Sequence, residues 1–145
     1  MRYLAMIKDI MDAIAIRLHE VFGDVYEINQ EDVAQGLKEP CFLITLVDYS
    51  KEPLLQSRSK RLVPFDILFF PSNGVMQCYE VADQMMNGLE LITLLDGDMM
   101  HGTKMKAEVV DGVLHFFVNY NFIGTVETEP LDNMESIAIE SGTKE

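Results

Sequence analysis

The feature that most constrains the fold is a β-hairpin within Met99–Ile123, because its register follows from the sequence. Asp111-Gly112 separates two strand-like runs, and this dipeptide favours a two-residue type I′ turn, which needs positive φ at both central positions. The turn places Val110 opposite Val113. Counting outward, one face pairs Val109 with Leu114, Ala107 with Phe116, Met105 with Val118 and Thr103 with Tyr120, and the other pairs Glu108 with His115, Lys106 with Phe117 and Lys104 with Asn119. The first face is almost wholly apolar, so we expect it to be buried, and the second is mixed and open.

The remaining periodicity predicts two amphipathic helices and three further strands. Residues 4–22 carry apolar side chains at helical spacing up to Gly23, and residues 75–95 do the same with Cys78, Ala82, Met85, Leu89 and Ile92. Strands are predicted at 24–28, 41–49 and 62–70, and residues 50–60 are predicted to form a polar loop. Gly88 inside the second helix lowers its stability unless a close helix–sheet contact requires it.

These elements predict an α+β fold. The expected order is α-β-β-β-α-β-β, with a mainly antiparallel or mixed sheet of four to five strands packed against the two helices. A length of 145 residues indicates one domain, which we place at 1–124, followed by an acidic tail or arm at 125–145. Cys41 and Cys78 lie in apolar runs without metal-ligand spacing, which favours buried free thiols.

The charge balance limits the classes of partner. The formal net charge is −13, which argues against a protein that grips nucleic acid through its phosphates but suits a surface past which DNA slides. No apolar run approaches the roughly 18 residues of a membrane span, so we expect no membrane partner.

Two clusters of polar residues could be mistaken for catalytic sites. Asp96, Asp98 and His101 could hold a divalent cation, but the other ligands of a calcium loop are absent, and a tight turn is the simpler interpretation. His115 and Glu108 could act as a base and its orienting carboxylate, but the derived register places them on an open sheet face. We therefore predict no catalytic residue, no metal ligand and no cofactor.

A basic segment interrupts the acidic chain. Lys51 to Arg61 contains four basic residues and one acidic residue, together with two leucines in a polar setting. The residues predicted to contact a neighbouring subunit or tail protein are Leu54, Leu55, Arg58, Lys60 and Arg61. Such a contact between copies would be head-to-tail, and contacts of this kind close into rings.

Three stretches resemble the small tail terminator proteins of long-tailed phages and prophages of Gram-positive bacteria. The first is Gln30-Glu31-Asp32-Val33-Ala34-Gln35-Gly36-Leu37-Lys38-Glu39-Pro40-Cys41-Phe42-Leu43-Ile44, the second is Pro64-Phe65-Asp66-Ile67 with Phe70-Pro71, and the third runs from Leu94-Leu95-Asp96-Gly97-Asp98 to Val110-Asp111-Gly112-Val113-Leu114-His115-Phe116. The resemblance covers about residues 5–123 and lies in the order and spacing of the stretches. We match no counterpart to the tail after Gly124.

The resemblance implies a non-enzymatic virion protein. Such proteins form a hexameric ring on the head-proximal end of the tail tube, stop its polymerisation, cap the sheath in contractile tails, and offer a surface to head-completion proteins. The implied partners are other copies of the chain, the tail tube protein, the sheath and the connector, with DNA passing through the ring without specific binding. The implied location is the virion tail, assembled in the bacterial cytoplasm, in a phage or a phage-tail-like particle.

Three alternatives remain open at this point. One is another ring protein of the head–tail junction, which would differ in its position in the particle. The second belongs to a different class: a small metal-assisted hydrolase using Asp96, Asp98 and His101. The third is a generic homo-oligomeric binding module.

Overall fold

The computed structural model describes residues 2–30 and 36–125 of the chain. Within them lie helices α1 (Arg2–Phe22) and α2 (Val75–Gly88). The ten strands are β1 (Glu27–Asn29), β2 (Cys41–Leu46), β3 (Ser50–Pro53), β4 (Arg58–Leu62), β5 (Pro64–Phe70), β6 (Leu91–Thr93), β7 (Met99–His101), β8 (Thr103–Val110), β9 (Val113–Asn119) and β10 (Phe122–Thr125). Of the acidic segment 125–145, only Thr125 lies within the described residues, and none of these helices is long and apolar enough to span a membrane.

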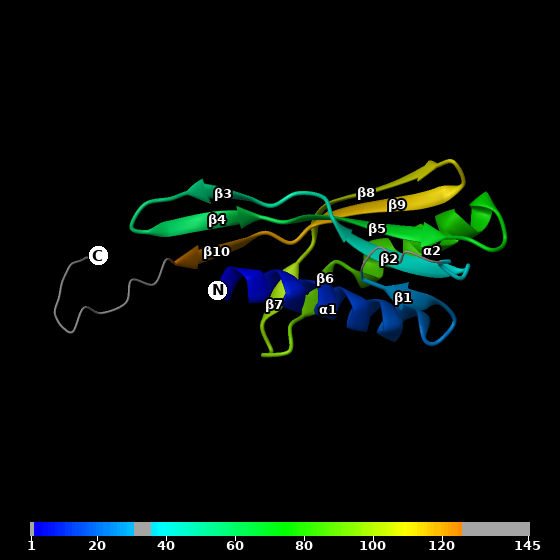
Figure 1. Cartoon of the computed structure of the whole chain (residues 1–145), viewed down its shortest axis with the longest axis horizontal. Helices are drawn as coiled ribbons and strands as arrows, with labels where there is room; N and C mark the ends of the chain where they lie inside the picture. Colours follow the sequence, from blue (N-terminus) through cyan, green and yellow to red (C-terminus); the bar gives the residue numbers. More distant parts are fainter. Residues whose placement is uncertain (1, 31–35, 126–145) are drawn as a thin grey trace.

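A five-stranded sheet organises the molecule in the order β1-β2-β5-β9-β8. All neighbours are antiparallel except β1 and β2, which are parallel. Both helices pack against one face of this sheet, and Figure 1 shows α1 running below the strands. The predicted α+β class, with a mixed sheet of four to five strands and two packed helices, is confirmed.

The core lies between that sheet face and the helices. Alternate residues of β5 and β9 are fully buried, as the period of two in a strand requires. The largest side chains without exposed surface are Tyr120, Phe42, Phe65, Phe69, Phe116, Ile10, Ile14, Leu18, Ile44, Ile67, Met85 and Leu89. Cys41 and Cys78 are buried free thiols, as predicted, and burial raises the pKa of each.

The derived hairpin register is correct near the turn and wrong at its open end. The observed pairs run from Val110 with Val113 to Lys106 with Phe117 as predicted, but Thr103 pairs with Asn119 rather than Tyr120. An extra residue in β8 causes the shift, and Lys104 there has a φ of 53°. The backbone N–H of Tyr120 instead donates to the carbonyl of Val63, 3.1 Å away. The predicted pairs of Met105 with Val118 and Lys104 with Asn119 are therefore lost.

The second helix ends earlier than predicted, at Gly88. A Cβ added at Gly88 would lie 2.6 Å from Cγ2 of Val21, so the close contact that explains this glycine is with helix α1, not with the sheet. The side chain of Arg17, also on α1, donates to the carbonyl of Gly88 at 2.7 Å and satisfies a helix-end acceptor. The chain after Gly88 forms β6, which pairs with β7. Ile92 is therefore buried as predicted, but it lies on a strand and not on the helix.

The prediction of a polar loop at residues 50–60 is wrong, because this segment contains β3 and the beginning of β4. β3 and β4 form a hairpin, and β10 adds a third strand to it. The predicted strand 62–70 is divided at Val63, since Leu62 ends β4 and Pro64 begins β5. The chain therefore has more strands than the predicted order α-β-β-β-α-β-β.

Candidate assembly interface

The basic segment lies in β3, β4 and the turn between them. These two strands and β10 form a three-stranded β-sheet, here called the arm, with the order β10-β4-β3. Figure 1 shows the arm extending beyond the five-stranded sheet at the end opposite α2. A two-stranded hairpin is marginal in water, so the pairing of β10 with β4 along four residues supports this projection. The arm is therefore held by residues about 60 positions away in the sequence.

The tip of the arm presents two leucines to solvent. Backbone hydrogen bonds between Leu54 and Arg58 (2.8 Å) and between Arg58 and Leu55 (3.3 Å) close the turn. Gln56 and Ser57 both have a φ of 61°. Leu54 is 40% exposed and Leu55 is 85% exposed. These predicted interface residues are thus available for contact with another protein.

The predicted basic residues divide between the two faces of the arm. In a strand, alternate side chains point to opposite faces, so Arg58 and Lys60 share one face, whereas Ser59 and Arg61 share the other. Ser59 is buried, and Nη1 of Arg61 donates to the hydroxyl of Tyr49 at 3.0 Å. Arg61 also lies over the Tyr49 ring, 5.8 Å from its centroid. Arg61 therefore anchors the arm, and Arg58 and Lys60 are better placed for a partner.

We expect Arg61→Ala to loosen the arm. The variant loses a charge-assisted hydrogen bond and a cation–π contact, which together stabilise the arm by roughly 1–2 kcal/mol. Amide hydrogen exchange in β4 and β10 should accelerate accordingly. Lys60→Ala is the matched control, because it removes a cation from the opposite face of the same strand. Equal exchange rates in the two variants would contradict an anchoring role for Arg61.

His115 lies on the sheet face opposite the helices, but its partner is not the predicted one. Glu108 is opposite His115 in the register, yet Nδ1 of His115 is 2.8 Å from Oδ2 of Asp66 on the other neighbouring strand. The ring of Phe117 stacks beside the imidazole at 6.2 Å. Asp66 was missed at the sequence level, although a carboxylate within the apolar run 62–70 was the available signal. The pair links β5 to β9.

The residues Asp96, Asp98 and His101 form a turn and its following strand. The carboxylate of Asp96 accepts a hydrogen bond from the backbone N–H of Asp98 at 2.9 Å, and Gly97 has a φ of 97°. These contacts confirm the turn interpretation. Within residues 2–30 and 36–125, no group of three or more His, Cys, Asp or Glu side chains is placed to hold a metal ion. The hydrolase alternative thus has no assembled site in that part of the chain.

A groove of about 830 Å³ lies where the arm joins the five-stranded sheet. Its lining includes Glu52 and Lys60 from the arm and His101 and Lys104 from β7 and β8. Small-molecule sites are mostly apolar with a few convergent polar groups, whereas these side chains carry both signs of charge and lie largely at the surface. Apolar side chains, among them Met99, Met100 and Phe122, complete the lining, so the groove combines charged and apolar surface.

Comparison with protein families identifies the family of this chain. A family model described as a phage tail terminator protein matches residues 9–132, a range that includes all ten strands, α2 and most of α1. The search of curated proteins found no matching relative.

Proposed function

Because the chain belongs to the phage tail terminator family, and is thus a structural protein of the tail, we propose that it forms a hexameric ring on the head-proximal end of the tail tube. The ring would stop tube polymerisation, cap the sheath where the tail is contractile, and bind the head-completion proteins. The family match over residues 9–132 is the observation that carries this proposal.

The charge distribution supports a ring through which DNA passes. The chain has 24 acidic and 11 basic residues, so its mean field repels the phosphate backbone. Four of the basic residues lie in the arm segment 51–61. If these four cations contact other proteins, the remaining surface keeps an excess of acidic residues. A ring lumen with this excess does not bind the passing DNA.

Disrupting the gene for this chain in its phage or tail-like particle should produce overlong tails without heads. An unterminated tube continues to add tube subunits, and without the ring the head lacks its docking surface. Electron microscopy of the lysate measures both tube length and head attachment. Restoring the wild-type gene from a plasmid is the control, and tubes of normal length joined to heads would contradict the proposal.

The same experiment separates the proposed role from that of another ring at the head–tail junction. Loss of a connector-completion protein would leave tubes of normal length that fail to join heads. Overlong tubes are therefore the result specific to a terminator. A reconstruction of the intact particle would then show whether the chain lies at the head-proximal end of the tube.

A further inference from the structure

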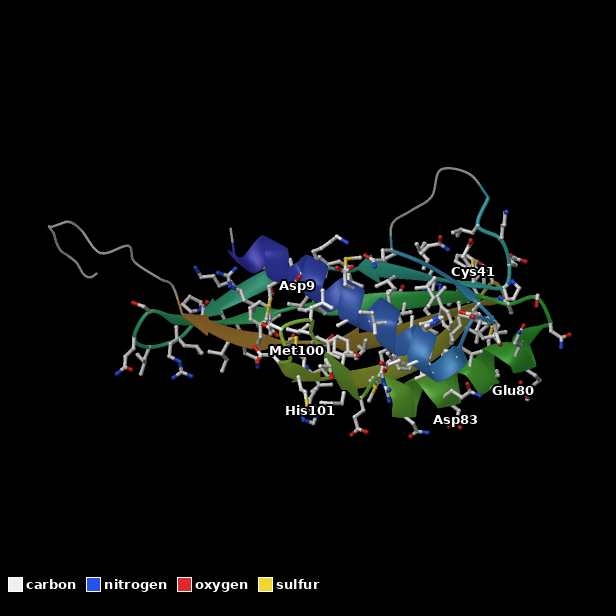
Figure 2. All side chains as sticks on the ribbon, turned by 90° about the horizontal axis from the view of Figure 1, so that it is seen from below. Asp9, Cys41, Glu80, Asp83, Met100 and His101 are labelled. Carbon is white, nitrogen blue, oxygen red and sulfur yellow. The ribbon has the colours of Figure 1, made fainter. Side chains whose placement is uncertain are left out.

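The arm and helix α2 lie at opposite ends of the molecule. Figure 1 shows β3, β4 and β10 at one end of the long axis and α2 near the other. In the view from the helix side, Glu80 and Asp83 of α2 again lie far from the arm (Figure 2). The arm of one chain therefore cannot reach its own α2. A contact between these two elements would have to join different copies.

The solvent-facing side of α2 has an unusual composition. Met76, Tyr79, Glu80 and Asp83 follow the spacing i, i+3, i+4, i+7 and form one line along the helix, here called the outer stripe. Met76 is 68% exposed and Tyr79 is 51% exposed, although the face of a surface helix away from the core is normally polar. No Lys or Arg occurs anywhere in α2. The outer stripe therefore combines two large apolar side chains with two carboxylates that have no cation on their own helix.

The tip of the arm has the complementary composition. Leu54 and Leu55 are exposed apolar residues, and Arg58 follows them at the start of β4. Lys60 lies on the same face of the strand as Arg58, whereas Arg61 is turned away toward Tyr49. Glu52 of β3 lies opposite Lys60 on this face, so Arg58 and Lys60 together leave a net positive charge beside the apolar tip. The outer stripe offers apolar surface next to negative charge.

We propose that the arm tip of one copy docks on the outer stripe of α2 in the next copy. Leu55 packs against Met76 and Tyr79, and Arg58 and Lys60 lie beside Glu80 and Asp83. Because the two surfaces are different and lie at opposite ends of one chain, the contact is head-to-tail and is repeated from copy to copy until the ring closes. Complementary charge selects the partner surface, and the apolar contact supplies most of the affinity. This inference rests on the proposed ring.

Charge reversal with rescue tests the pairing. Arg58→Glu with Lys60→Glu should weaken assembly at least tenfold, measured as the concentration at which rings dissociate in analytical ultracentrifugation. Glu80→Lys with Asp83→Lys should do the same, and combining all four substitutions should restore rings. The control combines the reversed arm with Glu90→Lys and Asp98→Lys, which make an equal charge change at exposed sites off the stripe. Rescue by this control as well, or no rescue by the stripe reversal, would overturn the proposal.

Cysteine cross-linking tests the same contact without changing charge. Leu55→Cys and Tyr79→Cys introduce two exposed thiols, while Cys41 and Cys78 are buried. Mild oxidation of the double variant should link successive copies into a ladder, both in purified protein and in assembled tails. Mixing the two single variants should stop at dimers. Leu55→Cys with Glu90→Cys is the control that should not cross-link.

The tests separate this inference from the proposed function. Normal rings and normal tube length with no cross-link between positions 55 and 79 would overturn the docking contact and leave the terminator role intact. A cross-link from Leu55→Cys to a partner of different mass in assembled tails would assign the arm to that partner and also overturn it. Tubes of normal length in the gene disruption would instead overturn the terminator role, whatever the arm contacts.

Discussion

Phe116→Ala is expected to lower the free energy of unfolding by about 3–5 kcal/mol. Phe116 has no exposed surface, and it lies on β9 between Ile67 of β5 and Ala107 of β8. Truncating its ring removes a large apolar contact and leaves a cavity that the flanking strands cannot close. Because a domain of this size is stable by roughly 5–15 kcal/mol, the loss takes a large share of the total. Urea denaturation followed by circular dichroism measures it.

Phe117→Ala is the matched control for that measurement. Phe117 is the next residue on the same strand, but it lies on the face opposite the helices and is only partly buried. We expect the loss to be about 1 kcal/mol. Both variants should be compared at protein concentrations where the unfolding midpoint no longer changes, since association would stabilise the folded state. Equal losses would contradict the assignment of one buried and one open sheet face.

Gly102→Ala should destabilise the protein by about 1–3 kcal/mol. A Cβ at this position would lie 2.8 Å from the backbone oxygen of Leu89 and 2.8 Å from Cγ2 of Val118. The oxygen belongs to the main chain and cannot move aside as a side chain can. That same carbonyl accepts the buried hydroxyl of Tyr120, so a displacement would also strain this hydrogen bond. Thermal unfolding of the variant should show the loss directly.

Two further variants identify why Gly102→Ala loses stability. Thr103→Ala changes the next, exposed residue and should alter stability by less than about 0.5 kcal/mol. Tyr120→Phe removes only the hydroxyl and leaves the Leu89 carbonyl without its donor, at a cost of about 1–3 kcal/mol. Burial raises the pKa of Tyr120, so its hydroxyl remains a donor throughout the neutral range. A fully stable Gly102→Ala protein would show that the backbone at Gly102 and Leu89 can move apart without loss of stability.

The parts of the fold that were predictable depend on neighbours in the sequence. The Asp111-Gly112 turn determined the register of the adjacent residues, because a two-residue turn has only one way to pair the strands beside it. Helical spacing identified the buried side of α2 through Cys78, Ala82 and Met85. The turn at Asp96–Asp98 followed from local hydrogen bonding in the same way.

The errors arise where distant residues decide the local structure. An extra residue in β8 shifts the hairpin register at its open end, and there the Tyr120 N–H bonds to Val63, which is far away in sequence. Helix α2 ends where Arg17 and Val21 of α1 meet Gly88. The polar segment 50–60 becomes strands because β10 pairs with β4, and its own composition carries no strong strand pattern.

The features of the candidate interface also differ in whether neighbouring or distant residues determine them. Local sequence patterns were enough to predict the α+β class, the buried face of the central hairpin and a basic, leucine-bearing segment in an acidic chain. Only the tertiary structure separated Arg61, bound to Tyr49, from Arg58 and Lys60, and placed the arm at the end of the molecule opposite the outer stripe of α2. The physical reason is that periodicity and turn chemistry act over a few residues. Which surfaces face solvent, and how far apart they lie, depends on strand pairing and helix packing between residues tens of positions apart.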